Sequence, residues 1–284
     1  MIPEAQQLPT PLLNVKRNLG EPYFESSSVL LYQGDCLELL KSIPEGSVDL
    51  VVTSPPYNIG KEYEEPLPLH EYVEWCESWM TALFPLLTET GSFWLNVGYV
   101  PIEGVGKAVP LPYLLWNRSP FYFVQEVVWN YGAGVAARKS FSPRNEKLLW
   151  YVKNPSSYYF DLDSVRDPDV KYPNQKKNGV LKCNPLGKNP TDVWQIAKVT
   201  SGKGRASAER TPHPAQFPQQ LIERITSACS PPGGLVLDPF AGSGTTCVVA
   251  QDQNRMSVGV DVSGRYLDIA IGRLTAHRPA SLPL

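Results

Sequence analysis

The stretch TSPPY, residues 53–57, carries groups that could hold a flat ring bearing an exocyclic amine. Ser54 offers a hydroxyl, Pro55 offers a carbonyl from a residue without an N–H, and Tyr57 offers an aromatic face. The two prolines fix φ near about −65° and push the residues before them out of the helical region, which makes the corner stiff and extended. Two acceptors beside a stacking surface suit an amino-bearing ring. The alternative interpretation is a rigid strand-to-loop turn with a tyrosine in the core.

A second constellation, LVLDPFAGSGTT at residues 235–246, could hold a nucleoside. Gly242 and Gly244 permit a tight turn and a close approach of a ligand to the backbone. Asp261 ends the next predicted strand, about 20 residues beyond the turn, where an acidic residue suits ribose hydroxyls. The phosphate-binding pattern GxGxxG is absent, and the carboxylates of Asp238 and Asp261 would repel a pyrophosphate. They suit a nucleoside that carries a cation, which points to S-adenosylmethionine; an ordinary strand-to-helix turn is the alternative.

Hydrophobic patterning predicts strands and helices that alternate along the chain. Strands are predicted at residues 28–32, 48–52, 91–98, 122–129, 147–152, 235–237 and 256–260. Helices are predicted at residues 36–41, 69–87, 110–116, 214–228, 245–253 and 264–277, after an irregular lead-in of about 27 residues. This alternation predicts an α/β fold with a doubly wound, mostly parallel sheet.

Charge is unevenly distributed along the 284 residues. The net charge is −2, but residues 138–210 hold 15 Lys and Arg against 7 Asp and Glu, a net of +8. The remainder then carries a net charge of −10. A basic segment on an acidic body is expected of a phosphate-binding face, with a solvated lysine-rich loop as the alternative.

Composition excludes several classes of protein. The five cysteines are widely spaced without a CxxC pattern, and there are three histidines, so neither a disulfide framework nor a metal centre is expected. There is no apolar run of 18 residues and no secretory signal pattern at the start. We therefore expect a cytoplasmic protein with no membrane span.

The chain resembles the bacterial DNA amino-methyltransferases of restriction-modification systems over residues 29–275. TSPPY matches the catalytic motif of that family, [DNS]-P-P-[YFW], and DPFAGSGTT matches its cofactor motif. The resemblance extends to GDCLELL, VDLVVTSPPYN, EKLLWYVKN, NPTDVW and TPHPAQFPQQLIERI. The catalytic motif precedes the cofactor motif, which is typical of the permuted group called β.

The resemblance implies three parts: residues 28–153 and 212–278 as the catalytic and cofactor-binding parts of one methyltransferase domain, and 154–211 as a basic target-recognition insertion. It implies that the catalytic residues are Ser54, Pro55, Pro56 and Tyr57. It implies that S-adenosylmethionine is bound by Asp35, Asp238, Phe240, Gly242, Gly244, Asp261, His213, Pro214 and Phe217. DNA contacts are expected from Arg138, Lys139, Arg144, Lys203 and Arg205. A structural capping role remains an alternative for Asp35 and for His213.

The activity implied is methyl transfer to the exocyclic amine of a flipped base in double-stranded DNA. Ser54 favours N4 of cytosine, whereas aspartate at that position is the commoner form for N6 of adenine, which stays the alternative. A catalytically silent DNA-binding homologue and an RNA or protein methylase are weaker alternatives. None of the five cysteines follows a proline, which argues against C5-cytosine chemistry. A cognate restriction endonuclease and a second copy of the chain are further candidate partners.

Overall fold

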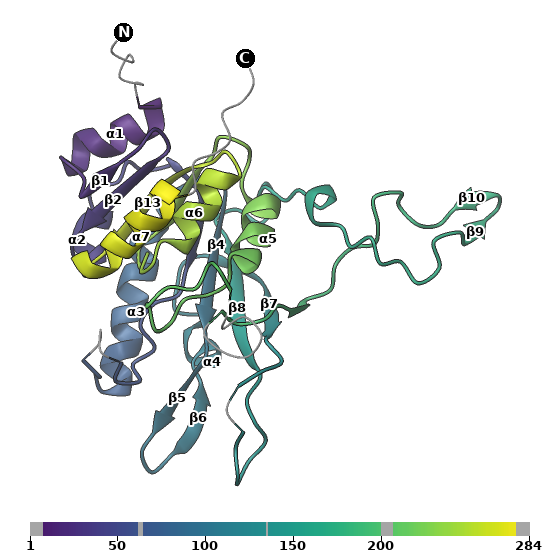
Figure 1. Ribbon diagram of the computed structural model, residues 1–284, viewed down its shortest axis with the longest axis horizontal. Helices are drawn as coiled ribbons and strands as arrows, with labels where there is room; N and C mark the ends of the chain where they lie inside the picture. The colour runs from purple at the N-terminus through teal and green to yellow at the C-terminus, as the bar shows by residue number, and fades with distance from the viewer. Residues whose placement is uncertain (1–7, 62–64, 135, 200–206, 277–284) are drawn as a thin grey trace.

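A computed structural model describes residues 8–61, 65–134, 136–199 and 207–276. Its centre is a nine-stranded sheet with the order β1-β2-β13-β12-β3-β4-β8-β7-β11 (Figure 1). Five neighbouring strands run parallel: β2 (Val29–Gln33), β13 (Met256–Asp261), β12 (Leu235–Asp238), β3 (Val48–Thr53) and β4 (Leu87–Val97). The predicted α/β fold with a mostly parallel sheet is confirmed.

The remaining strands of the sheet lie at its two edges. At one edge β1 (Phe24–Glu25) pairs antiparallel with β2. Beyond β4 come β8 (Asn145–Val152) and β7 (Tyr122–Asn130), both in antiparallel pairs, and then β11 (Val193–Gln195), which is parallel to β7. Because β8 runs antiparallel to β4, the first residues of β8 lie beside the carboxyl ends of the parallel strands.

Helices cover both faces of the sheet because successive residues of each strand point to opposite sides. On one face Val51 packs with residues of α1 (Thr10–Leu19), α2 (Cys36–Leu40), α3 (Leu69–Leu83) and α4 (Pro112–Leu115). On the other face lie α5 (Gln219–Cys229), α6 (Thr245–Asp252) and α7 (Gly264–Ala276) (Figure 1). The two apolar layers hold the sheet in place and leave its ends open.

The structure corrects several predicted boundaries. The predicted irregular lead-in contains α1, which buries Leu12 and Val15 completely. Its prolines occupy the positions at and just before the first turn, where the backbone N–H has no helical partner in any case. The helix predicted from residue 214 begins only at Gln219, because Pro218 is extended with ψ of 145°. The strand predicted from residue 91 begins earlier, at Leu87.

A hairpin that the patterning missed follows β4. It consists of β5 (Tyr99–Ile102) and β6 (Gly106–Pro110), which pair antiparallel outside the main sheet. Figure 1 shows the hairpin extending beyond the sheet at the end where β4 finishes. It therefore forms one side of the region in which the predicted catalytic corner lies.

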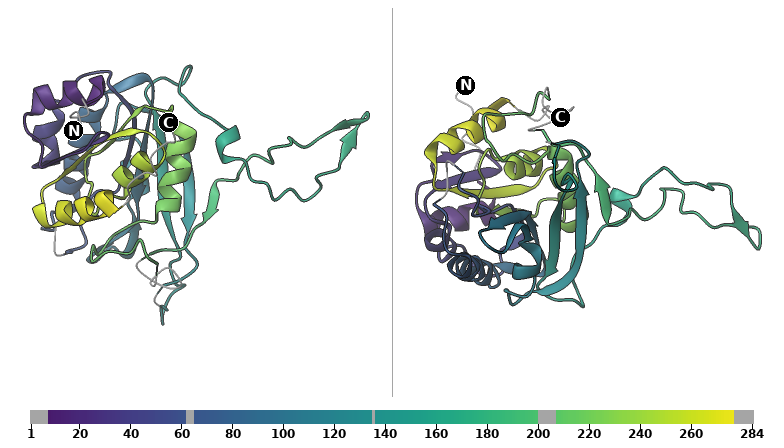
Figure 2. Two further views of the ribbon diagram at one scale, coloured as in Figure 1. Left: turned by 45° about the horizontal axis from the view of Figure 1, so that its top comes forward. Right: turned by 90° about the horizontal axis from the view of Figure 1, so that it is seen from below.

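The predicted target-recognition segment divides into a packed part and an arm. A short 3₁₀ turn, Asp163–Val165, contacts α5, and β11 joins the edge of the sheet. Between them Asp167 and Lys188 form a β-bridge that closes the neck of an arm. Beyond the neck lies a small ribbon of β9 (Lys176–Lys177) and β10 (Val180–Leu181), and every residue from 171 to 182 is exposed. Figure 2 shows the arm extending away from the sheet.

The order of the strands reverses between β3 and β12. From β3 the chain continues to β4 on one side, and from β12 it continues to β13 on the other. Open α/β sheets bind ligands at such a switch point, outside the carboxyl ends of the strands. Thr53 and Asp238 end these two strands, so the two predicted motifs begin side by side. In the part of the chain that the structure describes, no helix is long and apolar enough to cross a membrane.

Gly244 supplies a first prediction, because it starts α6 in the left-handed region with φ of +71°. A Cβ at this position would lie 2.6 Å from Cβ of Ala270 in α7. Gly244→Ala is expected to lower the free energy of unfolding by about 3 kcal/mol, from backbone strain and displacement of α7 together. Urea unfolding monitored by circular dichroism measures this loss.

The matched control is Gly46→Ala, because Gly46 also has a positive φ, +61°, but a Cβ there would meet open space. Strain alone should cost about 1 kcal/mol at that position. Equal losses in the two variants would contradict the close packing of the turn against α7.

Candidate functional site

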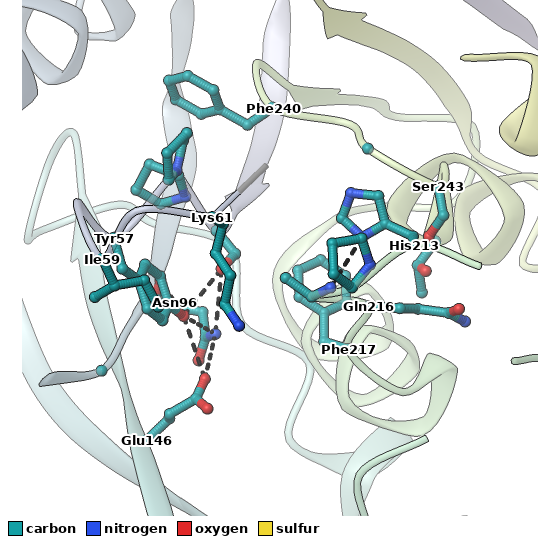
Figure 3. A pocket seen from close by; sticks show the side chains of 18 of the residues that line it. Tyr57, Ile59, Lys61, Asn96, Glu146, His213, Gln216, Phe217, Phe240 and Ser243 are labelled. Atoms are coloured by element: carbon teal, nitrogen blue, oxygen red, sulfur yellow. Dashed lines mark hydrogen bonds between the residues drawn. The ribbon is translucent and has the colours of Figure 1, made fainter. Parts of the chain in front are cut away.

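A cavity of about 590 Å³ lies at the carboxyl ends of the parallel strands and joins the two predicted motifs. From the first motif it is lined by Ser54, Pro55, Pro56 and Tyr57. From the second motif and its surroundings it is lined by Phe240, Gly242, Asp261, Asp35, His213, Pro214 and Phe217. Figure 3 shows Tyr57, Asn96 and Glu146 on one wall and His213 and Phe217 on the wall opposite.

The Ser54–Tyr57 corner is held from both sides. The Tyr72 hydroxyl of α3 donates to the Pro56 carbonyl at 2.7 Å. A Cβ on Gly98 would lie 3.2 Å from the Tyr57 ring, so the absence of a side chain there admits the ring. The hydroxyls of Ser54 and Tyr57 lie 3.0 Å apart. The corner therefore presents the serine hydroxyl to the cavity in a fixed position.

Two polar residues behind the corner complete a hydrogen-bonded network. Asn96, at the end of β4, is only 3% exposed, and its amide nitrogen donates to the Tyr57 hydroxyl at 2.7 Å and to Glu146 Oε2 at 3.1 Å. The Tyr57 hydroxyl also lies 3.2 Å from Glu146 Oε2. Burial, together with the carboxylate of Glu146, raises the pKa of Tyr57 well above its ordinary value. Tyr57 therefore stays protonated and can donate to Glu146.

Lys198 closes this network on the far side of Glu146. Its ammonium nitrogen lies 2.5 Å from Glu146 Oε1 and 3.9 Å from the centre of the Tyr131 ring. The loop that carries Lys198 follows β11, and the Trp129 indole fastens it by donating to the Ile196 carbonyl at 2.7 Å. The carboxylate of Glu146, which contacts Tyr57, is therefore neutralised by the ammonium group of Lys198.

The sequence interpretation did not single out Asn96, Glu146 or Lys198. Asn96 ends a predicted strand, which is a signal for a ligand site at the sheet edge. Glu146 stands at the head of the matched stretch EKLLWYVKN, but its place beside Tyr57 depends on β8 pairing antiparallel with β4. Lys198 reaches the site only because the short strand β11 pairs with β7. Such long-range pairings are not visible in local patterning.

Asp238 lies one layer behind the cavity wall. Its carboxylate is 1% exposed and accepts hydrogen bonds from Thr53 Oγ1 at 2.7 Å, Thr246 Oγ1 at 2.7 Å and the Phe240 N–H at 3.1 Å. Neither Asp238 nor Gly244 belongs to the described residues that line the cavity. Asp238 instead joins the end of β3 to the turn after β12, and Gly244 packs against α7.

Gly242 and Asp261 form the part of the turn that faces the cavity. The Gly242 N–H donates to Asp261 Oδ2 at 2.8 Å, and the Ser263 N–H donates to Oδ1 at 2.8 Å. Burial raises the pKa of Asp261 from its ordinary value, whereas these two donors lower it. Gly242 has φ of +51°, and a Cβ there would meet His213 Nε2 at 2.9 Å. Glycine is therefore required both by the backbone and by the histidine ring.

Asp35 and His213 combine the two roles considered for each of them. Asp35 caps α2, because its Oδ1 accepts the Leu37 N–H at 2.7 Å, and it also lines the cavity. His213 Nδ1 accepts the Ala215 N–H at 3.3 Å, and its ring lies 4.4 Å from the Tyr266 ring while forming part of the wall. Both residues support their own loops and face the same space.

Three of the residues predicted to bind DNA lie in the described loop between β7 and β8. Arg138 and Lys139 are exposed there. Arg144 donates to the Pro143 carbonyl at 2.8 Å and to the Gly134 carbonyl at 3.2 Å, so it also supports the loop. Lys203 and Arg205 lie outside the described residues.

The cavity fits a nucleoside with a cationic side chain. Asp35 and Asp261 line it with carboxylates that can accept hydrogen bonds, and Gly242 lines it beside the His213 ring. The Phe240 ring, packed 5.2 Å from the Trp79 ring, adds an apolar surface. Over the described parts of the chain, no group of three or more His, Cys, Asp or Glu residues could hold a metal ion.

Asp238 generates a prediction about pH. Burial raises its pKa to about 6, above the value of about 4 expected in the unfolded chain. Between these values the folded protein binds more protons than the unfolded chain, so the free energy of unfolding falls as pH rises. The loss attributable to Asp238 should reach about 3 kcal/mol above about pH 6.

Asp238→Asn should remove this loss, because asparagine does not titrate. Relative to the wild type, the variant should gain stability between about pH 4 and about pH 7, as measured by urea unfolding at both values. A stability difference that is the same at the two pH values would contradict the assignment.

Comparison with known proteins identifies the family. The family described as DNA methylase matches residues 48–272. The Type II methyltransferase M.ScaI of Streptomyces caespitosus is 67% identical over 273 residues, which cover 96% of this chain and 90% of that protein. The DNA adenine methyltransferase YhdJ of Escherichia coli (strain K12) is 30% identical, with 88% of this chain and 84% of that protein covered.

Two solved structures share the fold. The PvuII DNA methyltransferase (cytosine-N4-specific) superimposes with a TM-score of 0.73 at 25% identity, covering 94% of this chain and 92% of that one. TTHA0409 of Thermus thermophilus, in complex with S-adenosyl-L-methionine, gives a TM-score of 0.61 at 25% identity, covering 87% of this chain and 93% of that one. The chain therefore belongs to the DNA methylase family of restriction-modification systems.

Proposed function

We propose that this site-specific DNA methyltransferase modifies the N4 amine of cytosine. The observation that supports this most is the Ser54 hydroxyl, which faces the same cavity as the cofactor turn and is oriented by Tyr57. We assign residues 28–153 and 212–278 to the methyltransferase domain and 154–211 to target recognition. Double-stranded DNA is the substrate, and the protein contacts it through the loop between β7 and β8 and through the arm beyond the Asp167–Lys188 bridge.

The directions of the hydrogen bonds around Ser54 allow its hydroxyl oxygen to accept a hydrogen bond from the target amine. Tyr57 can donate its proton to Glu146 Oε2 or to the Asn96 carbonyl, both at 3.2 Å, and Ser54 can then donate its own proton to Tyr57. Asn96 Nδ2 also donates to Ser54 Oγ, at 3.4 Å, so one lone pair of this oxygen is left for an N–H group of the target amine. The Pro55 carbonyl is a second acceptor on the same corner.

The amine needs this help because its lone pair is delocalised into the ring. Hydrogen bonds from the amine to Ser54 and Pro55 favour tetrahedral nitrogen and localise the lone pair, and positioning provides much of the rate. Tyr57 provides a face on which the flipped base can stack. Bound S-adenosylmethionine supplies an electrophilic methyl group, and Asp35, Phe240, Gly242 and Asp261 are the residues that would hold it.

Cytosine is preferred over adenine because serine occupies the first position of the SPPY motif. The PvuII enzyme is named as specific for cytosine N4, whereas YhdJ is named as an adenine methyltransferase. N6 of adenine therefore stays the alternative. The intact motif and the ordered network disfavour a silent homologue. A cognate endonuclease and a homodimer are proposed partners, and we place the enzyme in the cytoplasm.

The base is identified by mass spectrometry of nucleosides from DNA methylated in vitro. We expect N4-methylcytosine after incubation of unmodified DNA with the protein and S-adenosylmethionine. N6-methyladenine alone would overturn the choice of cytosine while leaving the amine chemistry intact.

Substitutions at the corner separate the hydroxyl from the ring. Ser54→Ala and Tyr57→Ala should lower kcat by roughly 100-fold or more, because an acceptor or the stacking face is lost. Tyr57→Phe keeps the ring but releases Ser54 from its partner, so a loss of roughly fivefold to tenfold is expected. Steady-state methylation assays measure these rates, and calorimetry should show unchanged cofactor affinity.

The matched control is Tyr151→Phe. The Tyr151 hydroxyl is buried without a hydrogen-bond partner among the described residues, so its removal should leave the rate unchanged. Full activity in Ser54→Ala and Tyr57→Ala together would exclude this corner as the amine-binding site.

A further inference from the structure

Phe141 has an unusual environment for a phenylalanine. Its side chain is 102% exposed, the highest value among the large apolar side chains of the described residues. The other described phenylalanines are partly or fully covered by the fold, including Phe93, which is completely buried. Leaving such a ring in water forgoes the free energy of burying it, so its exposure points to a partner rather than to folding.

The loop that carries Phe141 connects β7 to β8 and is fastened at several points. The Tyr131 N–H donates to the Arg144 carbonyl at 3.1 Å at its base. Nearer its tip, the Ala137 N–H donates to Ser142 Oγ at 2.9 Å. This bond encloses residues 138–141, so Phe141 lies in a short hydrogen-bonded tip.

The charge of this loop suits DNA. Arg138 and Lys139 share the tip with Phe141, and Arg144 lies at the base. No acidic residue occurs in the sequence from 131 to 145. A basic tip around an apolar ring can neutralise phosphates while the ring enters between bases.

The loop is also part of the active-site wall. Tyr131, Pro143 and Asn145 at its two ends line the cavity. Figure 1 shows the loop between β7 and β8 extending beyond the same end of the sheet as the β5–β6 hairpin. A duplex that delivers a base into the cavity must therefore pass close to this tip.

We propose that Phe141 inserts into the DNA stack at the position vacated by the flipped target base, while Arg138 and Lys139 hold the neighbouring phosphates. The inference rests on the proposed function, because it assigns a second contact to the same reaction. Unstacking a base step costs free energy, and an apolar side chain that fills the gap recovers part of that cost.

The test compares Phe141→Ala with the wild type on two duplexes that carry the recognition sequence, mapped by sequencing methylated DNA from a host that expresses the protein. In one duplex the target base is paired, and in the other it faces a mismatch. We expect Phe141→Ala to lower kcat/KM by about tenfold or more on the paired duplex. On the mismatched duplex the loss should shrink to within about threefold, because less unstacking is needed. Phe141→Trp, which keeps a stacking ring, should retain the wild-type ratio.

Two controls distinguish insertion from general binding or instability. Tyr122→Ala removes another exposed aromatic at the opposite end of β7 and should leave both rates unchanged. Arg138→Ala and Lys139→Ala should each weaken binding to both duplexes equally. Each should also reduce the slope of the logarithm of the binding constant against the logarithm of the salt concentration by about one.

Each other result contradicts the proposal in a defined way. No loss in Phe141→Ala, or an equal loss on both duplexes, would exclude insertion while the wild-type activity still supports the proposed function. Methylation of neither duplex by the wild type would overturn both.

Discussion

The site depends on one buried carboxylate at the point where the strand order reverses. Asp238 accepts hydrogen bonds from Thr53 at the end of β3 and from Phe240 and Thr246 in and after the next turn. These bonds fix the distance between the segment that leads into Ser54 and the segment that carries Gly242. Burial raises the pKa of Asp238, which shows that the protein maintains this link at a cost in stability. Ser54 of the first motif and Gly242 and Asp261 of the second thus line one cavity.

The residues that surround Ser54 determine the charge at this corner. Serine rather than aspartate stands at the corner, and the Tyr57 hydroxyl contacts both Ser54 Oγ and the carboxylate of Glu146. The ammonium group of Lys198 neutralises the charge of that carboxylate, and the neutral amide of Asn96 also donates a hydrogen bond to it. The neutral corner agrees with a reaction in which localisation of a lone pair, rather than removal of a proton, activates the amine.

The positions of the Ser54–Tyr57 corner and of the glycine turn could be predicted because each is a contiguous motif with strong backbone chemistry. Prolines define the corner, and Gly242 and Asp261 define the turn, so their types are informative without a structure. Asp238 and Gly244 were predicted to bind the cofactor, but they do not line the cavity, because burial behind its wall is a tertiary property that the motif does not encode. Glu146 and Lys198 were missed because strands far apart in the sequence pair to bring them to the site. The helix α1 was missed because burial of its apolar side chains outweighs the local signal of the prolines near residue 10.

The most direct test is a crystal structure of the protein with S-adenosylhomocysteine and a duplex that contains the mapped recognition sequence. The account predicts that the target base lies outside the duplex on the face of Tyr57. Its exocyclic amine should lie within hydrogen-bond distance of Ser54 Oγ and the Pro55 carbonyl, and the nucleoside should lie against Gly242 and Asp261. A target base that remains stacked in the duplex, or an amine that faces the His213 wall, would contradict it.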